Sequence, residues 1–257
     1  MANFLSKRSL IKPFLAIEML TKANQKKLKD KNIINMDVGE PGIKTPDYLK
    51  KYIQSLIEKE NIGYTESIGM PLLREKISQH YKRWYGTNIT LSNVALTPGA
   101  SGAFILSLLA IFDVGDNVAI MTPFYPAYVN TLKSFGLNII FIRGKVEHGF
   151  QPTLKELKKI QNRVDWIIIA SPANPTGSII EKSEMILIAK WCKKNNIKII
   201  SDEIYHGIEY ENKSDTMFSY NKNSIVINSF SKYFNMTGWR LGWIIASKEY
   251  INVIEKL

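Results

Sequence analysis

Short apolar runs alternate with amphipathic stretches from about residue 93 onward. The runs that we interpret as strands are 94–96, 117–121, 138–142, 166–170, 197–201, 224–228 and 241–246. They are almost continuously apolar, as buried parallel strands are. In the stretch between two of them, Met185, Ile188, Ala189 and Cys192 share one face at helical spacing. This alternation predicts an α/β fold with a mostly parallel central sheet and helices on both faces.

The first ninety residues have a different pattern. We expect an extended arm, a helix over 14–29 and a short strand within 33–42 that ends in a Gly/Pro loop. Thr45-Pro46-Asp47 opens a second helix, and Pro71 begins a third that runs to about Trp84.

Composition restricts the class of protein. A chain of 257 residues with 45% hydrophobic content can bury one large core. The single cysteine, Cys192, excludes an internal disulfide and fits a reducing cytoplasm. The start has no secretory pattern, and the longest apolar run, 103–112, is too short to span a bilayer. We therefore expect a cytoplasmic protein with no membrane partner.

The formal net charge is +11, which allows binding to nucleic acid. The lysines are scattered along expected helix surfaces, and no nucleic-acid-binding motif is present, so we favour a solvated surface. The three histidines lie far apart without metal-ligand spacing, and we expect no metal site.

Ligands of open α/β sheets bind at the carboxyl ends of the strands, so the residues that follow each strand are the candidates. Gly99, Ala100 and Ser101 open a helix after 94–96, and their backbone N–H groups suit a phosphate, although an ordinary turn has the same pattern. Tyr125 follows 117–121, and its ring suits either stacking on a flat heterocycle or a place in the core.

Asp202 follows the run 197–201. A carboxylate at a buried strand end is costly unless it is paired with a cation, so we expect either a cationic partner or a helix N-cap role. Asn174 lies in Asn-Pro-Thr-Gly, a turn signal after 166–170.

The stretch 229–240, SFSKYFNMTGWR, places Lys232 beside two serines and upstream of Arg240. An amine made reactive by neighbouring cations and burial is a nucleophile, and an arginine with hydroxyls suits a phosphate. Together they suggest pyridoxal phosphate carried on a Schiff-base lysine. A surface lysine in a polar turn is the alternative.

The same stretch resembles the cofactor-lysine segment of the fold type I aminotransferases, the aspartate-aminotransferase-like class I/II family. The resemblance extends from about Ile11 to the end of the chain. It implies that Lys232 carries the cofactor, Asp202 keeps the pyridine nitrogen charged, and Tyr125 lies over the ring. Asn174 and Tyr205 would contact the phenolic oxygen. The residues implied to hold the phosphate are Gly99, Ala100, Ser101, Ser229, Ser231 and Arg240.

The resemblance also implies a homodimer, in which Tyr64 reaches the phosphate of the neighbouring subunit and Gly39, like Asn174, contacts the substrate. By the same comparison, residues 1–45 form an N-terminal arm and small-domain segment, and residues 46–257 form the cofactor-binding large domain. We expect the C-terminal small domain of the family, with its carboxylate-clamping arginine, to be absent.

The implied function is transfer of an amino group between an α-amino acid and a 2-oxo acid in amino acid biosynthesis. Lys232 would move the proton, with Asp202 and Tyr205 as the other catalytic residues. A β-lyase, decarboxylase or racemase would share every cofactor residue. A fragment that only binds the cofactor, or a sensory domain of a transcription regulator, are further alternatives, although the latter needs a DNA-binding segment that we do not find.

Overall fold

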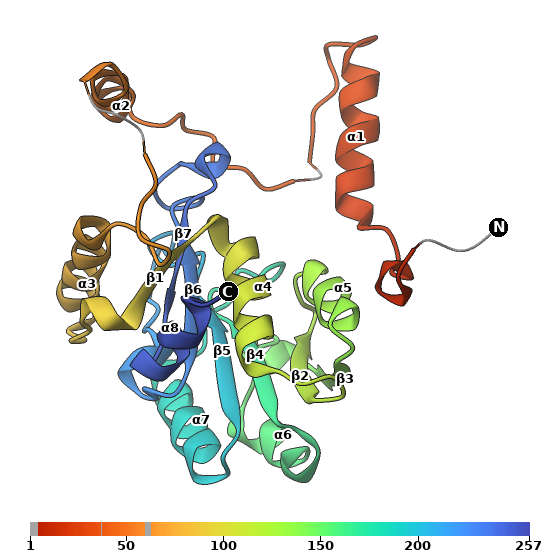
Figure 1. Ribbon diagram of the computed structural model, residues 1–257. Coiled ribbons are helices and arrows are strands. Elements are labelled where there is room, and N and C mark those ends of the chain that lie inside the picture. Colours follow the sequence, from red (N-terminus) through yellow and green to blue (C-terminus); the bar gives the residue numbers. More distant parts are fainter. Residues whose placement is uncertain (1–4, 37, 60–62) are drawn as a thin grey trace.

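The computed structural model describes residues 5–36, 38–59 and 63–257. A seven-stranded sheet forms the centre of the molecule, in the order β1-β7-β6-β5-β4-β2-β3 (Figure 1). The strands are β1 (Val94–Thr97), β2 (Asn117–Thr122), β3 (Asn138–Arg143), β4 (Trp166–Ala170), β5 (Lys198–Asp202), β6 (Ile225–Ser229) and β7 (Gly242–Ile245). The seven predicted strands are thus confirmed to within a residue or two at each end.

Only β7 runs against its neighbours. It pairs antiparallel with both β1 and β6, whereas the pairs β2–β3, β2–β4, β4–β5 and β5–β6 are parallel. Six strands therefore point the same way, and their carboxyl ends share one edge of the sheet. The predicted mostly parallel sheet is confirmed.

Helices cover both faces of the sheet. The helices are α1 (Leu15–Lys27), α2 (Asp47–Lys59), α3 (Pro71–Tyr85), α4 (Gly99–Ile111), α5 (Ala127–Ser134), α6 (Leu154–Lys158), α7 (Lys182–Lys194) and α8 (Lys248–Ile254). Buried residues of α3, α6 and α7 pack on one face, and those of α4, α5 and α8 pack on the other. The predicted face of α7 is confirmed, because Met185, Ile188, Ala189 and Cys192 are all buried. Among the described helices, none is both long and apolar enough to cross a membrane.

The N-terminal segment stands away from the sheet (Figure 1). Helices α1 and α2 bury none of their residues in this chain. The strand expected within 33–42 is wrong for the described residues, 33–36 and 38–42, which form no strand; position 37 lies outside the description. Its apolar residues have no neighbouring strand to pair with, and Ile34 and Met36 are exposed.

Candidate active site

The strand ends bring the predicted residues to one edge of the sheet. Gly242, the first residue of β7, pairs with both Thr97 at the end of β1 and Ser229 at the end of β6. On the other side of β6, Asp202 ends β5 level with Ala170 at the end of β4. The loops that carry the candidate residues therefore leave the sheet side by side, as ligand sites of open α/β sheets require.

Lys232 lies in the loop after β6 and is partly buried. Its Nζ donates a hydrogen bond to the backbone oxygen of Gly39, at 2.9 Å, and lies 6.0 Å from the centre of the Tyr205 ring. Partial burial lowers the pKa of Lys232; Glu40 opposes this shift and Arg240 adds to it. A lowered pKa increases the share of free amine, the form that attacks a carbonyl.

Asp202 is a buried carboxylate, only 7% exposed. Its Oδ2 accepts a hydrogen bond from the Tyr128 hydroxyl, and its Oδ1 accepts one from the Ile204 N–H at 3.2 Å. Burial raises the pKa of Asp202 to about 6, although both hydrogen bonds act to lower it. The helix N-cap alternative is wrong, because a turn and not a helix follows Asp202.

No cation compensates this carboxylate within the part of the chain that the structure describes. None of the ion pairs there includes Asp202. A buried acid of this kind favours a cationic ligand, because the ligand's charge removes the cost of ionising the carboxyl away from water.

Asn174 and Tyr205 come from different loops and meet at this edge. The amide nitrogen of Asn174 donates to the Tyr205 hydroxyl at 3.2 Å. Both side chains are only partly buried, so both can hydrogen-bond a ligand as well. Tyr125 lies nearby, its ring perpendicular to that of Tyr128 with 5.6 Å between centroids. It is 36% exposed, which rules out a core role.

Two glycines form a cradle beside Arg240. Gly99 begins α4 with a φ of 72°, and a Cβ there would lie 2.6 Å from Nη2 of Arg240. A Cβ on Gly242 would lie 2.7 Å from the carbonyl carbon of Gly99 and 3.0 Å from the nitrogen of Ala100. The guanidinium and the N-terminus of α4 are therefore packed together, as an anion site needs.

Two predicted serines border the same cradle. Ser229 ends β6, and its Oγ accepts a hydrogen bond from the Ser231 N–H at 3.1 Å. Both serine side chains are buried. Ser101 follows in the first turn of α4 and is exposed. These hydroxyls can donate hydrogen bonds to an anion that the positive charge of Arg240 attracts.

The site as a whole fits pyridoxal phosphate. The cradle at Arg240 suits its phosphate, the uncompensated carboxylate of Asp202 suits a protonated ring nitrogen, and the amine of Lys232 suits its aldehyde. An ordinary strand-to-helix turn does not need a glycine cradle, an uncompensated buried carboxylate or a partly buried amine, and here all three are present.

Gly39, implied to contact the substrate, and Tyr64, implied to reach the neighbouring subunit, lie in different surroundings. Gly39 faces Lys232 through its backbone oxygen, and Thr45 binds the same loop, with its Oγ1 donating to the oxygen of Asn235 at 2.9 Å. Tyr64 is fully exposed. The structure therefore brings Gly39, but not Tyr64, to the site of its own chain.

Tyr128 is the main residue that the sequence interpretation missed. It occupies α5 one helical turn after Tyr125 and is buried against Asp202. A signal was present, because a buried carboxylate needs donors, and a tyrosine that follows another strand of the same parallel sheet, here β2, can supply one.

Comparison with known proteins agrees with this geometry. The family described as aminotransferase class I and II matches residues 31–257. A valine–pyruvate aminotransferase of Mycobacterium tuberculosis is 35% identical over 95% of this chain and 64% of its own length. The chain therefore belongs to the class I and II aminotransferase family, whose members depend on pyridoxal phosphate.

Solved structures give the same result. A crystal structure of an aminotransferase from Mycobacterium tuberculosis has a TM-score of 0.94 at 33% identity, covering 99% of this chain and 66% of that one. Aspartate aminotransferase from Thermus thermophilus with maleate has a TM-score of 0.93 at 26% identity, covering 98% and 67%. The chain spans about two thirds of the length of these relatives.

Proposed function

We propose that this protein is a pyridoxal-phosphate-dependent aminotransferase that moves an amino group between an α-amino acid and a 2-oxo acid. The observation that carries the proposal is the uncompensated buried Asp202 at the same sheet edge as the amine of Lys232. Family membership supports the reaction class.

When bound, pyridoxal phosphate supplies an aldehyde that bonds amines and a ring that withdraws electrons from the carbon bearing the amino group. Lys232 is the residue we propose to bond the aldehyde as a Schiff base. Its lowered pKa also suits it to accept a proton from the α-carbon of the amino acid and to return one. Asp202 would hold the ring nitrogen in its protonated form.

The remaining site residues bind and orient. We assign the phenolic oxygen to Asn174 and Tyr205, and one ring face to Tyr125. The phosphate would be held by Gly99, Ala100, Ser101, Ser229, Ser231 and Arg240. Gly39 and Asn174 are the proposed substrate contacts.

We also propose the wider organisation. Residues 1–45 would form the arm and small-domain segment, and residues 46–257 the large domain. The exposed side chain of Tyr64 and the unburied faces of α1 and α2 support a homodimer in which Tyr64 reaches the neighbouring site. The single cysteine supports a reducing, cytoplasmic location. The role that we propose there is in amino acid biosynthesis, in keeping with the aminotransferase family.

The test is transfer of label. The protein with pyridoxal phosphate would be given a panel of ¹⁵N-labelled amino acids and unlabelled 2-oxo acids, with Lys232→Ala as control. We expect label in a new amino acid only with the unchanged protein. Loss of carbon dioxide or of a side-chain fragment, without transfer of nitrogen, would overturn transamination in favour of another reaction on this fold.

A further inference from the structure

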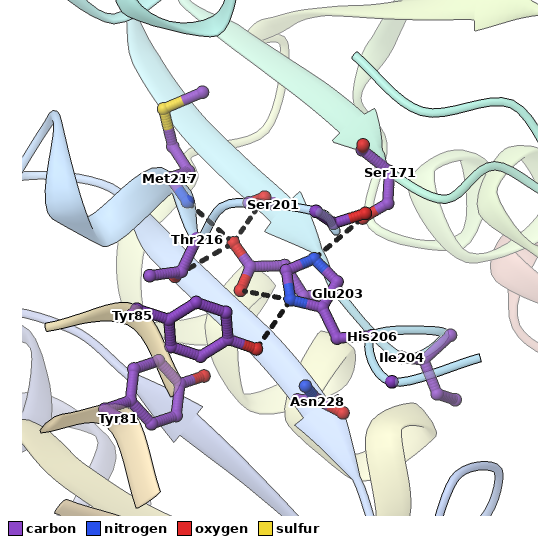
Figure 2. Close-up of polar contacts among 12 residues, drawn as sticks. Tyr81, Tyr85, Ser171, Ser201, Glu203, Ile204, His206, Thr216, Met217 and Asn228 are labelled. Atoms are coloured by element: carbon purple, nitrogen blue, oxygen red, sulfur yellow. Dashed lines mark hydrogen bonds and ion pairs between the residues drawn. The ribbon is translucent and has the colours of Figure 1, made fainter. Parts of the chain in front are cut away.

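A buried polar cluster lies at the end of β5, around the residue that directly follows Asp202 (Figure 2). Its centre is Glu203, which is 1% exposed. One carboxyl oxygen, Oε1, accepts from Ser201 Oγ at 3.0 Å, from Thr216 Oγ1 at 3.2 Å and from the Met217 N–H at 2.8 Å. The other oxygen, Oε2, has no hydrogen-bond partner and faces His206. Neither Glu203 nor His206 has a role in the site described above.

The hydrogen bonds of His206 determine its tautomer. Its Nε2 lies 2.8 Å from the backbone oxygen of Ser171. A carbonyl oxygen only accepts, so Nε2 carries a hydrogen. Its Nδ1 lies 2.7 Å from the hydroxyl of Tyr85, the last residue of α3. In a neutral ring Nδ1 is an acceptor, and the Tyr85 hydroxyl then donates to it.

Burial favours this neutral form. It lowers the pKa of His206 and raises the pKa of Glu203, because both charged forms lose their hydration. Oε2 of Glu203 and Nδ1 of His206 are 3.7 Å apart, which is too long for a hydrogen bond. Burial therefore favours the neutral form of both side chains over an ion pair.

The imidazole connects the two loops that carry the site. Ser171 begins the loop that leads to Asn174, and His206 directly follows Tyr205. The loops meet twice, once through Asn174 and the Tyr205 hydroxyl and once, deeper, through the Ser171 oxygen and His206. Rotation of the ring would break the deeper contact, and Tyr85 opposes that rotation from the helix side.

We propose that His206, held by Tyr85, is a positioning residue that sets the relative placement of Asn174 and Tyr205, the pair assigned to the cofactor's phenolic oxygen. The proposal rests on the proposed function. Two donors on separate loops can serve one oxygen only if the loops are fixed to a fraction of an ångström, and outer hydrogen bonds supply that precision. Donors that bind the phenolate form lower its pKa, so a loosened pair should raise it.

The experiment compares Tyr85→Phe with Tyr81→Phe. Tyr81 lies one turn earlier on α3 and is fully buried, and its hydroxyl accepts from Trp243 Nε1 at 3.3 Å, whereas the hydroxyl that bonds Nδ1 of His206 is that of Tyr85. Both variants lose one hydroxyl from the same helix. His206→Gln, which keeps a side-chain N–H for the Ser171 oxygen, is the third variant.

The first measurement is the pH titration of the visible band of the cofactor-loaded proteins. We expect its midpoint to rise by roughly half a pH unit or more in Tyr85→Phe and to stay unchanged in Tyr81→Phe. It should shift less in His206→Gln than in a fourth variant, His206→Phe, which has no side-chain N–H for the Ser171 oxygen. A wild-type protein without a band would overturn the proposed function and this inference together. A normal band with equal midpoints in Tyr85→Phe and Tyr81→Phe would overturn the positioning role alone.

The second measurement needs no cofactor. ¹⁵N-histidine NMR of the unloaded protein should show His206 as the neutral Nε2–H tautomer at neutral pH, with its resonances identified by their loss in His206→Gln. A doubly protonated ring, or the Nδ1–H tautomer, would contradict the hydrogen-bond assignment on which the inference depends.

Discussion

The hydroxyl of Tyr128 donates a hydrogen bond to Oδ2 of Asp202, the buried carboxylate at the end of β5. The two residues are 74 positions apart in the chain and meet because β2 and β5 end at the same edge of the sheet. The bond stabilises the ionised carboxylate and so acts against the rise in pKa that burial causes.

Tyr128→Phe should therefore shift the pH dependence of cofactor binding. Without this donor the pKa of Asp202 rises above about 6, so a larger share of the carboxyl is neutral near pH 7. As the pH is lowered, we expect the affinity for pyridoxal phosphate to decrease at a higher pH in the variant than in the unchanged protein. Equilibrium titration between about pH 5 and 8 measures this, and superimposable profiles would show that the hydroxyl does not tune Asp202.

Asp202→Asn should have opposite effects on stability and on binding. The pKa of Asp202 is raised from 3.8 to about 6 on folding, so the folded chain holds more protons and the unliganded protein loses stability as pH rises through that window. Above it, the charge costs about 3 kcal/mol, since each pKa unit corresponds to about 1.4 kcal/mol. Asparagine removes this charge and retains polar atoms for Tyr128 and the Ile204 N–H.

We therefore expect the unliganded asparagine variant to melt higher than the unchanged protein near pH 7.5 and equally near pH 4, by calorimetry at about these two values. Its affinity for pyridoxal phosphate should fall about tenfold or more, since the ring nitrogen loses its counter-charge. A variant that binds equally well would assign Asp202 a purely structural role in the turn.

Arg240→Gln should separate the phosphate from the rest of the cofactor. The guanidinium packs on the N-terminus of α4, so its loss should lower the affinity for pyridoxal phosphate by roughly 10- to 100-fold. Pyridoxal, which lacks the phosphate, should bind the unchanged protein and Arg240→Gln with the same affinity. Arg143→Gln, at the end of the outer strand β3, is the control and should change neither affinity. Equal weakening of both ligands would contradict an anion site at Arg240.

Gly242→Ala should disrupt the cradle, because the added Cβ would lie 2.7 Å from the Gly99 carbonyl carbon and 2.9 Å from the Asn228 oxygen. Backbone atoms cannot move aside cheaply, so we expect a loss of about 1–3 kcal/mol in the free energy of unfolding. Gly238→Ala, four residues earlier in the same segment, meets nothing within 4 Å and is the control. Denaturant unfolding of both variants measures the difference, and equal stabilities would contradict the close packing of β7 on α4.

The sequence predicted the strands well because buried parallel strands are short, continuous apolar runs. In a mostly parallel sheet the residues that follow the strands converge, which is why Asp202 and Asn174 are candidates from the sequence. Lys232 and Arg240 are candidates because of the stretch 229–240 and its family resemblance. The family resemblance supplied roles that spacing alone left open, as for Asp202.

Other features depend on contacts between distant parts of the chain. The bond from Tyr128 to Asp202, the close approach at Gly242 and the bridge from Tyr85 to Ser171 each join different loops or helices, and no local pattern encodes them. The strand predicted within 33–42 is wrong over the described residues, 33–36 and 38–42, for the converse reason. The apolar residues there resemble a strand, but a strand also needs a neighbouring strand to pair with.

The central claim is that Lys232 forms the covalent bond to the cofactor, and reductive trapping tests it most directly. The protein would be incubated with pyridoxal phosphate, treated with borohydride and mapped by peptide mass spectrometry. Lys222, whose pKa burial also lowers but which lies over the Phe218 ring, is an internal control for non-specific labelling. We predict stoichiometric label on Lys232, none on Lys222, and loss of the yellow colour in Lys232→Ala. Label on another lysine, with Lys232 unmodified, would contradict the account.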